Sequence, residues 1–247
     1  MRLDVFLTEN GYFKSRSKSQ SAISNGEVIV DGVMVSKPSF EVDGSEKIEV
    51  KTVSRFVSRA GEKLSQALDV FKIDVTDLTV LDIGASTGGF TDCVLQNGAS
   101  HVFALDVGSA QIDKKLINDN RVTVIENFNA RYAKKSDFDK EIDMIVMDVS
   151  FISQTLIYPA CADILDCGKY MITLIKPQFE AGKKHIGKGG IVHDRDGKIL
   201  SEILEKLDIS AKLCGFERID FTDSPIQGGD GNKEYLALFK RVNTEKE

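Results

Sequence analysis

The sequence predicts an α/β protein with a doubly wound, mostly parallel sheet whose last strand runs antiparallel, preceded by a small α+β unit. From about residue 60, short apolar runs alternate with helix-like segments, as in parallel sheets that are covered on both faces. The loop of residues 224–234 between the last two runs is too short for a helical crossover. Those two strands must therefore pair antiparallel.

The first part of the chain is expected to form the small unit. Two short segments with apolar residues at helical spacing indicate two helices. Two β-rich runs then flank Asp31 and Gly32, a pair typical of a type I′ hairpin turn, and residues 47–50 supply a closing strand. A unit of this size has only a thin core, so we expect an accessory module. The predicted division is a small unit at 1–50, a linker at 51–59, a main domain at 60–242 and a polar tail at 243–247.

The main domain is predicted from the order of its apolar runs. Near-continuous apolar runs of this length are typical of strands buried on both faces. Seven such runs lie, in chain order, at residues 79–84, 101–108, 122–127, 143–150, 170–176, 218–224 and 235–240. The clearest helical patterns lie at residues 61–71 and 194–207.

The composition is that of a globular protein with a real core. Of the 247 residues, 42% are hydrophobic and 28% are charged. The net charge is −6, with +1 in residues 1–60 and −7 in the remainder, which argues against a uniformly basic nucleic-acid binder. The four cysteines form no CxxC pair and the three histidines are scattered, so we expect neither disulfides nor a structural metal.

The sequence gives no signal for a membrane. The longest uncharged stretches fall short of the roughly 20 apolar residues that span a bilayer. The N-terminus lacks the apolar core and cleavage site of a signal peptide. We therefore expect a cytoplasmic protein without a membrane partner.

A glycine-rich segment, LDIGASTGGFTD at residues 81–92, follows the first strand of the main domain and opens a helix. It lacks the lysine of a phosphate-binding P-loop, and its GxxxGG order matches the dinucleotide fingerprint only weakly. S-adenosylmethionine fits better, because Asp82 suits a ligand with an amino group. Asp106 ends the next strand, where an acid can accept hydrogen bonds from ribose hydroxyls. The alternative, that the glycines only end a strand and cap a helix, is weakened by Asp106.

The predicted cofactor contacts lie in this loop and at the neighbouring strand ends. They are Asp82, Gly84, Ala85, Ser86, Gly88, Gly89, Phe90, Asp106, Val107, Asn127, Asn129 and Asp148. Asn127 and Asn129 both follow the third strand, where adenine contacts usually lie, and the sequence does not choose between them. Phe151 is a candidate to stack on adenine or on a target base, or to pack in the core.

Four charged residues form a second constellation at the strand ends. Asp148 closes the fourth strand and Lys176 the fifth, Glu234 opens the last, and Lys63 lies on the first helix of the main domain. In a doubly wound sheet these positions converge on the ligand pocket. Two structural salt bridges are the alternative explanation, but four such residues beside a glycine loop favour catalysis.

These motifs resemble those of the TlyA family, in which an S4-type RNA-binding module is joined to an FtsJ-like methyltransferase. The resemblance covers essentially the whole chain and rests on SRAGEKL, LDIGASTGGFTD, ALDVG, ENFNAR, MDVSFIS, LIKPQFE and GKGGIVHD. The family consists of bacterial rRNA 2′-O-methyltransferases and is also described as hemolysin-like. The resemblance implies a Rossmann-like methyltransferase sheet, S-adenosylmethionine as the cofactor, and rRNA or a ribosomal subunit as the partner, with a cytidine ribose as the target.

The resemblance also implies a Lys-Asp-Lys-Glu tetrad, matched here by Lys63, Asp148, Lys176 and Glu234. A ribose 2′-hydroxyl is a poor nucleophile while protonated, whereas a sulfonium methyl group is already electrophilic. The protein must align the reacting atoms and remove a proton. We hypothesise that Lys176 is the base, that Lys63 favours its neutral form, and that the two acids orient the lysines.

Basic residues in two segments are expected to bind RNA, mainly through its phosphates. In the small unit they are Arg2, Lys14, Arg16 and Lys18. In a glycine-rich stretch after the fifth strand, which is expected to be a mobile loop at the mouth of the pocket, they are Lys183, Lys184 and Lys188. A solvated charged face is the alternative for the first set, and a solvated, disordered loop for the second.

Two other functions are alternatives to methyl transfer. A membrane-active hemolysin would need a basic amphipathic helix or an apolar span, and neither is present in the sequence. A non-catalytic RNA-binding protein would not need an intact tetrad.

Overall fold

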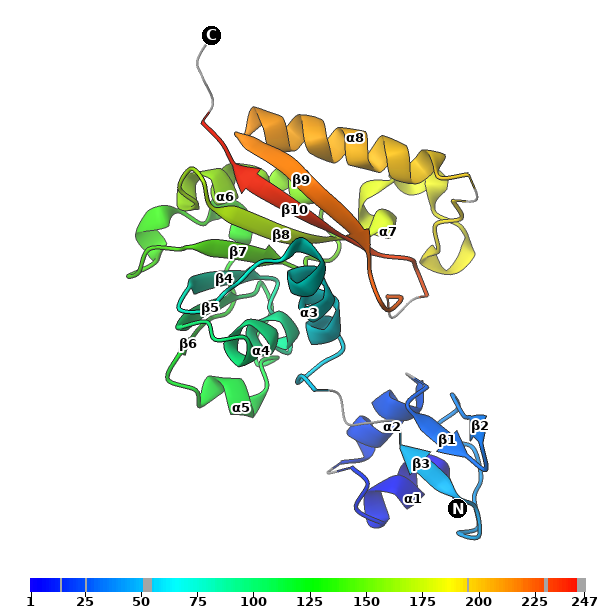
Figure 1. Ribbon diagram of the computed structural model, residues 1–247. Helices are drawn as coiled ribbons and strands as arrows, with labels where there is room; N and C mark the ends of the chain where they lie inside the picture. The colour runs from blue at the N-terminus through cyan, green and yellow to red at the C-terminus, as the bar shows by residue number, and fades with distance from the viewer. Residues whose placement is uncertain (14, 25, 51–54, 195, 229–230, 244–247) are drawn as a thin grey trace. The chain divides into compact units, whose positions relative to one another are not determined.

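The chain folds into two compact units (Figure 1). The computed structural model describes residues 1–13, 15–24, 26–50, 55–194, 196–228 and 231–243. The two units are Met1–Arg55 and Phe56–Glu247. The division falls inside the segment expected to be the linker. The first four residues of that segment, 51–54, and the end of the polar tail, 244–247, lie outside the described residues.

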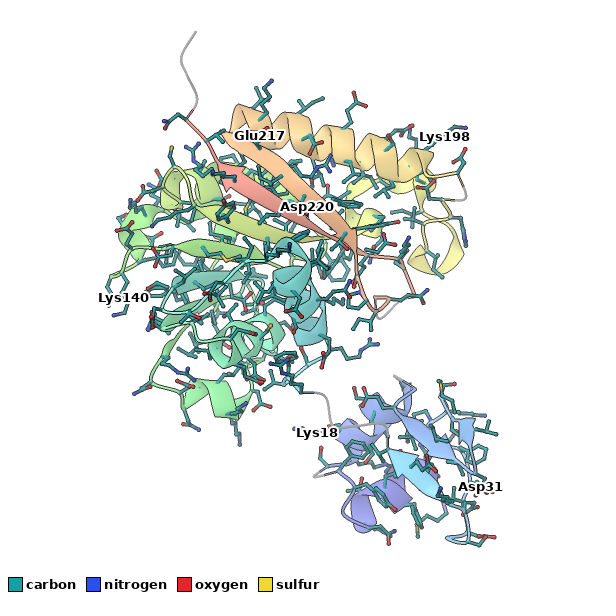
Figure 2. All side chains as sticks on the ribbon, in the orientation of Figure 1. Lys18, Asp31, Lys140, Lys198, Glu217 and Asp220 are labelled. Carbon is teal, nitrogen blue, oxygen red and sulfur yellow. The ribbon has the colours of Figure 1, made fainter. Side chains whose placement is uncertain are left out.

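The N-terminal unit packs two helices against a small antiparallel sheet. Its elements are α1 (Leu3–Glu9), α2 (Arg16–Ser24), β1 (Val28–Val30), β2 (Val33–Met34) and β3 (Ile48–Val50), with strand order β2-β1-β3. Leu7, Ile23 and Val28 lie in its core. Asp31 and Gly32 have φ angles of 50° and 79°, as the predicted type I′ turn requires. Asp31 is exposed at this turn (Figure 2).

A seven-stranded sheet forms the centre of the second unit, and it confirms the predicted α/β class. Its strands are β4 (Thr79–Ile83), β5 (His101–Leu105), β6 (Val122–Ile125), β7 (Met144–Met147), β8 (Tyr170–Ile175), β9 (Phe216–Asp223) and β10 (Tyr235–Arg241). Their order is β6-β5-β4-β7-β8-β10-β9. The pairs from β6 to β8 are parallel, whereas β10 is antiparallel to both β8 and β9. The last strand therefore runs against its neighbours, as predicted.

Helices cover both faces of this sheet, because side chains of each strand point alternately to the two faces. The helices are α3 (Ala60–Phe71), α4 (Gly89–Gln96), α5 (Lys114–Ile117), α6 (Tyr158–Ile164), α7 (Pro177–Glu180) and α8 (Lys198–Leu213). Val80 packs with α3 and α4 on one face. The next residue, Leu81, packs with α6 and α8 on the other face. In Figure 1, α8 lies along β9 and β10, on the far side of them from α3.

Short 3-10 turns complete the unit. They are η1 (Ala130–Tyr132), η2 (Lys135–Asp137), η3 (Gln154–Leu156), η4 (Lys183–His185) and η5 (Lys188–Gly190). Among the described helices, none is both long enough and apolar enough to cross a bilayer.

The sheet has one switch point, between β4 and β7. The chain moves outward from β4 to β5 and β6, and then returns to add β7 and β8 on the other side of β4. The loops that leave β4 and β7 therefore diverge over opposite faces and leave a crevice between them. The candidate site lies at this edge.

Candidate active site

The loop after β4 closely approaches the loop after β7. Gly84 has a φ of +82°, and a Cβ there would lie 2.5 Å from the carbonyl oxygen of Asp148. Gly89 begins α4, and a Cβ there would lie 2.2 Å from Oγ of Ser58. No side chain fits at either position without a shift of the neighbouring segment. The glycine order of this loop therefore reflects packing against two other segments.

Asp106 lies immediately after β5 and helps to shape the same loop. Its two carboxylate oxygens accept hydrogen bonds from the backbone amides of Gly108 at 2.7 Å and Ser86 at 2.8 Å. Each oxygen keeps a lone pair that can accept another hydrogen bond. The carboxylate also lines a cavity, so its free acceptor sites face a space that a ligand can enter.

Two adjoining cavities lie over the switch point. The larger has a volume of about 420 Å³ and the smaller about 150 Å³. Both are lined by Gly84, Ser86, Asp148 and Ser150, which join them into one crevice. The larger volume lies in the range of small-molecule sites. Its walls combine the Asp106 carboxylate with apolar side chains that include Val107 and Phe128, a set that fits a nucleoside.

The structure brings most of the predicted cofactor contacts to these walls. The larger cavity is lined by Gly84, Ser86, Asp106, Val107, Asn129 and Asp148. The smaller cavity adds Ala85, Gly89 and Phe90. Of the two asparagines, Asn129 lies on the wall. Asn127 takes a left-handed turn with a φ of 57° and is not among the described lining residues.

Asp82 lies beneath the loop, in β4. It is fully buried, and one oxygen accepts hydrogen bonds from the backbone amide and hydroxyl of Thr91 at 2.9 and 2.6 Å. Burial raises the pKa of Asp82 to about 7, although the hydrogen bond from the Thr91 side chain works in the opposite direction. Neither Asp82 nor Gly88 belongs to the walls formed by the described residues. Asp82 can therefore support the loop through Thr91.

Several lining residues were not identified from the sequence. They are Ser58, Ala60, Ile83, Thr87, Leu105, Gln111, Phe128, Ala130, Val149, Ser150, Ile152 and Ile157. Phe128 and Val149 lie within three residues of the ends of β6 and β7, and this position near a strand end is a signal that the sequence contains. Gln111 and Ser58 lie in irregular segments, where no periodicity predicts the direction of a side chain.

The four charged residues form two lysine–acid pairs at the carboxyl edge of the sheet. Lys63 on α3 forms a buried ion pair with Glu234. Nζ of Lys176 lies 2.6 Å from an oxygen of Asp148, and both side chains are less than one-fifth exposed. The register of β8 and β10 pairs Ile175 with Tyr235, so the next positions, Lys176 and Glu234, lie opposite each other. The two pairs are therefore neighbours.

The loop after β7 presents an exposed aromatic ring to the larger cavity. Phe151 has a left-handed φ of 63°, which is unfavourable for a bulky residue. Its side chain is 90% exposed, which excludes the core role considered above, and its ring packs on Phe179 at a centroid distance of 4.9 Å. A strained, exposed phenylalanine at a cavity is typical of a ligand contact.

A buried polar network holds this loop in place. The side chain of Gln154 donates to the carbonyl of Leu174 at 2.7 Å, and the Gln154 amide donates to Glu180 at 2.8 Å. The Ser153 hydroxyl donates to the same carboxylate at 2.6 Å, and Lys206 pairs with it at 3.0 Å. The backbone strain at Phe151 is thus maintained by contacts to β8, α7 and α8.

Comparison with known proteins identifies the family. The FtsJ-like methyltransferase family matches residues 56–241, and the S4 domain matches residues 1–48. The chain belongs to the FtsJ-like methyltransferase family. It is 48% identical over 240 residues to "Hemolysin A" of Brachyspira hyodysenteriae, covering 97% of this chain and 99% of that protein.

Two further relatives bear on fold and activity. The chain is 38% identical to "16S/23S rRNA (cytidine-2'-O)-methyltransferase TlyA" of Mycobacterium tuberculosis, covering 99% of this chain and 91% of that one. A solved structure of a protein described as a hemolysin from Streptococcus thermophilus superposes with a TM-score of 0.78 at 42% identity, covering 98% of this chain and 89% of that one. The predicted resemblance to the TlyA family is confirmed.

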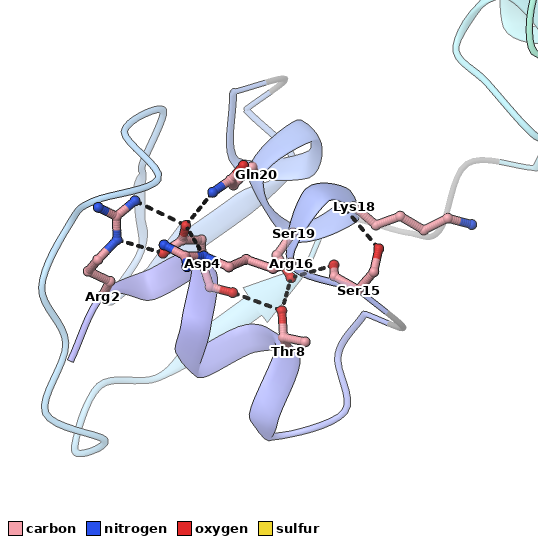
Figure 3. A network of polar contacts seen from close by, with 8 residues as sticks. All are labelled: Arg2, Asp4, Thr8, Ser15, Arg16, Lys18, Ser19 and Gln20. Carbon is pink, nitrogen blue, oxygen red and sulfur yellow. Dashed lines mark hydrogen bonds and ion pairs between the residues drawn. The ribbon is translucent and has the colours of Figure 1, made fainter. Parts of the chain in front are cut away.

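The S4 domain contains a buried acid held by two arginines (Figure 3). Asp4 is fully buried and accepts two hydrogen bonds from Arg2, both at 3.0 Å, and one from Arg16 at 3.0 Å. Gln20 donates a fourth at 2.6 Å. The hydrogen bonds from Arg2 contribute most to lowering the pKa of Asp4. Both arginines are about half exposed, so each can still reach a phosphate.

The structure describes some of the other basic residues that were predicted to bind RNA, but not all of them. Lys18 of the S4 domain is exposed (Figure 2), and Lys14 lies outside the described residues. In the methyltransferase unit Lys184 is exposed, and the backbone around it forms η4 and η5. Lys183 and Lys188 belong to these two turns.

The side chain of Asn232 anchors the stretch that contains these two turns. It accepts a hydrogen bond from the Val192 amide at 2.9 Å and donates one to the Gly190 carbonyl at 3.0 Å. Asn232 precedes Glu234 by two residues. The basic stretch is thus bonded to the segment that leads into the tetrad.

Proposed function

We propose that this protein transfers a methyl group from S-adenosylmethionine to a ribose 2′-oxygen of ribosomal RNA. The observation that carries the proposal is the pair of lysine–acid contacts at the carboxyl edge of the sheet, beside a crevice that fits a nucleoside. The S4 domain and the rRNA (cytidine-2'-O)-methyltransferase named among the relatives support rRNA as the substrate and a cytidine ribose as the target.

The crevice has the chemistry that the cofactor needs. Asp106 offers acceptor sites to ribose hydroxyls, and Val107 and Phe128 offer apolar surface to an adenine ring. The loop from Gly84 to Gly89 lines the smaller cavity, which leads from this nucleoside region to Lys176. Bound S-adenosylmethionine would supply an electrophilic methyl group and a positive charge at this point. Phe151, exposed at the rim, offers a surface on which a base can stack.

Lys176 is the proposed base. It lies on the wall of the smaller cavity, where a ribose hydroxyl can approach its amine. The Asp148 carboxylate favours the ammonium form, whereas a positive charge in the adjoining cavity favours the neutral amine. Glu234 and Lys63 neutralise each other on the neighbouring strand and helix, so the amine is not surrounded by uncompensated acids. A positioned base of this kind contributes about 10²–10⁴-fold in rate.

Removal of the amine tests the proposal. Lys176→Ala should lose about 10²–10⁴-fold in the rate of methyl transfer, with cofactor affinity changed by less than about threefold. Lys240→Ala is the matched control, because Lys240 lies on β10 opposite Tyr170, at the other end of the same ladder. Transfer of radiolabelled methyl to ribosomal subunits gives the rate, and primer extension at low dNTP separates ribose from base methylation. Full activity of Lys176→Ala would refute the proposed base.

A further inference from the structure

The Lys176 amine has two close oxygen neighbours, and they differ in geometry. Asp148 lies at 2.6 Å, within ion-pair distance, but its oxygen is not aligned for a hydrogen bond. The aligned hydrogen bond of Nζ goes to Oγ of Ser150 at 2.8 Å. Ser150 lies two residues after Asp148, is exposed, and lines both cavities. The serine therefore lies beside the amine on the wall of the smaller cavity, which Lys176 also lines.

The direction of the amine matters for its role as a base. A neutral lysine amine carries two N–H bonds and one lone pair, and only the lone pair can accept a proton. A carboxylate is an acceptor alone, so the lone pair is repelled from the side of Asp148. A serine oxygen that accepts an N–H excludes the lone pair from its own side as well. Only the remaining direction is left for the lone pair.

We propose that Ser150 is a positioning residue that fixes the lone pair of Lys176 toward the ribose hydroxyl. This inference rests on the proposed function, because it concerns the same base. Asp148 alone leaves the amine free to rotate about its Cε–Nζ bond, and the serine supplies the second fixed direction. Ser150 would therefore act on the alignment of the reacting atoms. Catalytic rates are sensitive to misalignment on the scale of 1 Å.

The charged groups around the Lys176 amine do not supply the aligned hydrogen-bond acceptor that Ser150 provides. Asp148 faces it from the β7 loop, and Glu234 lies opposite in the β8–β10 register. Lys63 on α3 forms an ion pair with Glu234, so its ammonium group points toward that acid. None of these three offers Lys176 an aligned acceptor among the hydrogen bonds of the described residues.

Three variants test the inference in the full-length protein. Ser150→Ala removes the acceptor, Ser150→Thr keeps the oxygen at an exposed position, and Ser153→Ala perturbs the same loop without touching Lys176. The readouts are kcat for methyl transfer, cofactor affinity by calorimetry, RNA affinity and thermal melting. Ser150→Ala should lose about tenfold to a hundredfold in kcat with both affinities unchanged, and threonine should restore most of it.

Rescue by threonine provides the readout that a merely structural role would not change. Threonine restores the acceptor oxygen beside Lys176, so it should recover kcat only if that oxygen is what the reaction needs. Unchanged or increased kcat in Ser150→Ala would overturn the inference, and so would equal losses in the two alanine variants without rescue by threonine. Full activity of Lys176→Ala would instead refute Lys176 as the base, and a wild type that methylates no ribose would refute the proposed function itself.

Discussion

Replacement of Asp82 by asparagine should remove a pH-dependent loss of stability from the methyltransferase unit. Asp82 is fully buried, and its second oxygen has no hydrogen-bond partner. Burial raises its pKa from 3.8 to about 7. The carboxyl group of the folded protein therefore stays protonated over a range in which the unfolded chain has already ionised.

The direction and size of the pH dependence follow from the difference between the pKa values of Asp82 in the folded and unfolded states. Between about pH 4 and pH 7 the folded state binds one proton more than the unfolded state, so the free energy of unfolding falls as the pH rises. The slope is at most about 1.4 kcal/mol per pH unit, and the total over roughly three units is about 4 kcal/mol. Above about pH 7 both states are ionised and this contribution no longer changes. An asparagine does not titrate and should have none of this slope.

Urea unfolding of the wild type and of Asp82→Asn at pH 5, 6, 7 and 8, without cofactor, measures the difference. Near-UV circular dichroism is a suitable probe, because four of the five tyrosines lie in the methyltransferase unit. The wild type should lose about 2–3 kcal/mol relative to the variant between pH 5 and pH 7. Thr91→Val removes a donor to the carboxylate and should extend the fall to higher pH. Parallel curves for the wild type and Asp82→Asn would refute the reasoning.

Three further changes have defined outcomes. Gly84→Ala adds a Cβ 2.5 Å from the Asp148 carbonyl at a positive φ, so it should cost about 1–3 kcal/mol and abolish cofactor binding, measured by melting and calorimetry. Glu180→Gln removes the carboxylate that pairs with Lys206 and should lower stability by about 1–3 kcal/mol and reduce kcat, with wild-type values contradicting the role of the network. Arg16→Gln should reduce the slope of log affinity for rRNA against log salt by about 0.7–0.9, and an unchanged slope would show that Arg16 contacts no phosphate.

The fold was predictable because its signals are local and repeated. Each buried strand is an apolar run, and the length of the loop at residues 224–234 alone required an antiparallel last strand. The same pattern placed Asp148 and Lys176 at the sheet edge, because both directly follow such runs. Their partners were harder to predict, since the β8–β10 register that brings Glu234 opposite Lys176 is a long-range property.

Side-chain direction limited the prediction of the site. Asp82 has the expected place in the loop, but it faces the interior and bonds Thr91. Arg16 lies twelve residues after Asp4, and no periodicity links the two across the turn between the helices. Ser150 depends on the backbone of its loop, where the left-handed φ of Phe151 follows from distant contacts. Such features arise from tertiary packing, which a single sequence does not display.

The antiparallel pairing of β10 has a consequence for how this enzyme family can change. Leu236 and Phe239 are buried on opposite faces of the sheet, so a shift of the pairing by one position would move each set of side chains into the core that is packed around the other set. Because Glu234 immediately precedes this strand, the buried side chains of β10 also fix the position of this acid opposite Lys176. A one-residue insertion between Glu234 and Leu236 should leave a folded sheet with a displaced acid, whereas volume-conserving apolar substitutions within the strand should leave the acid in place.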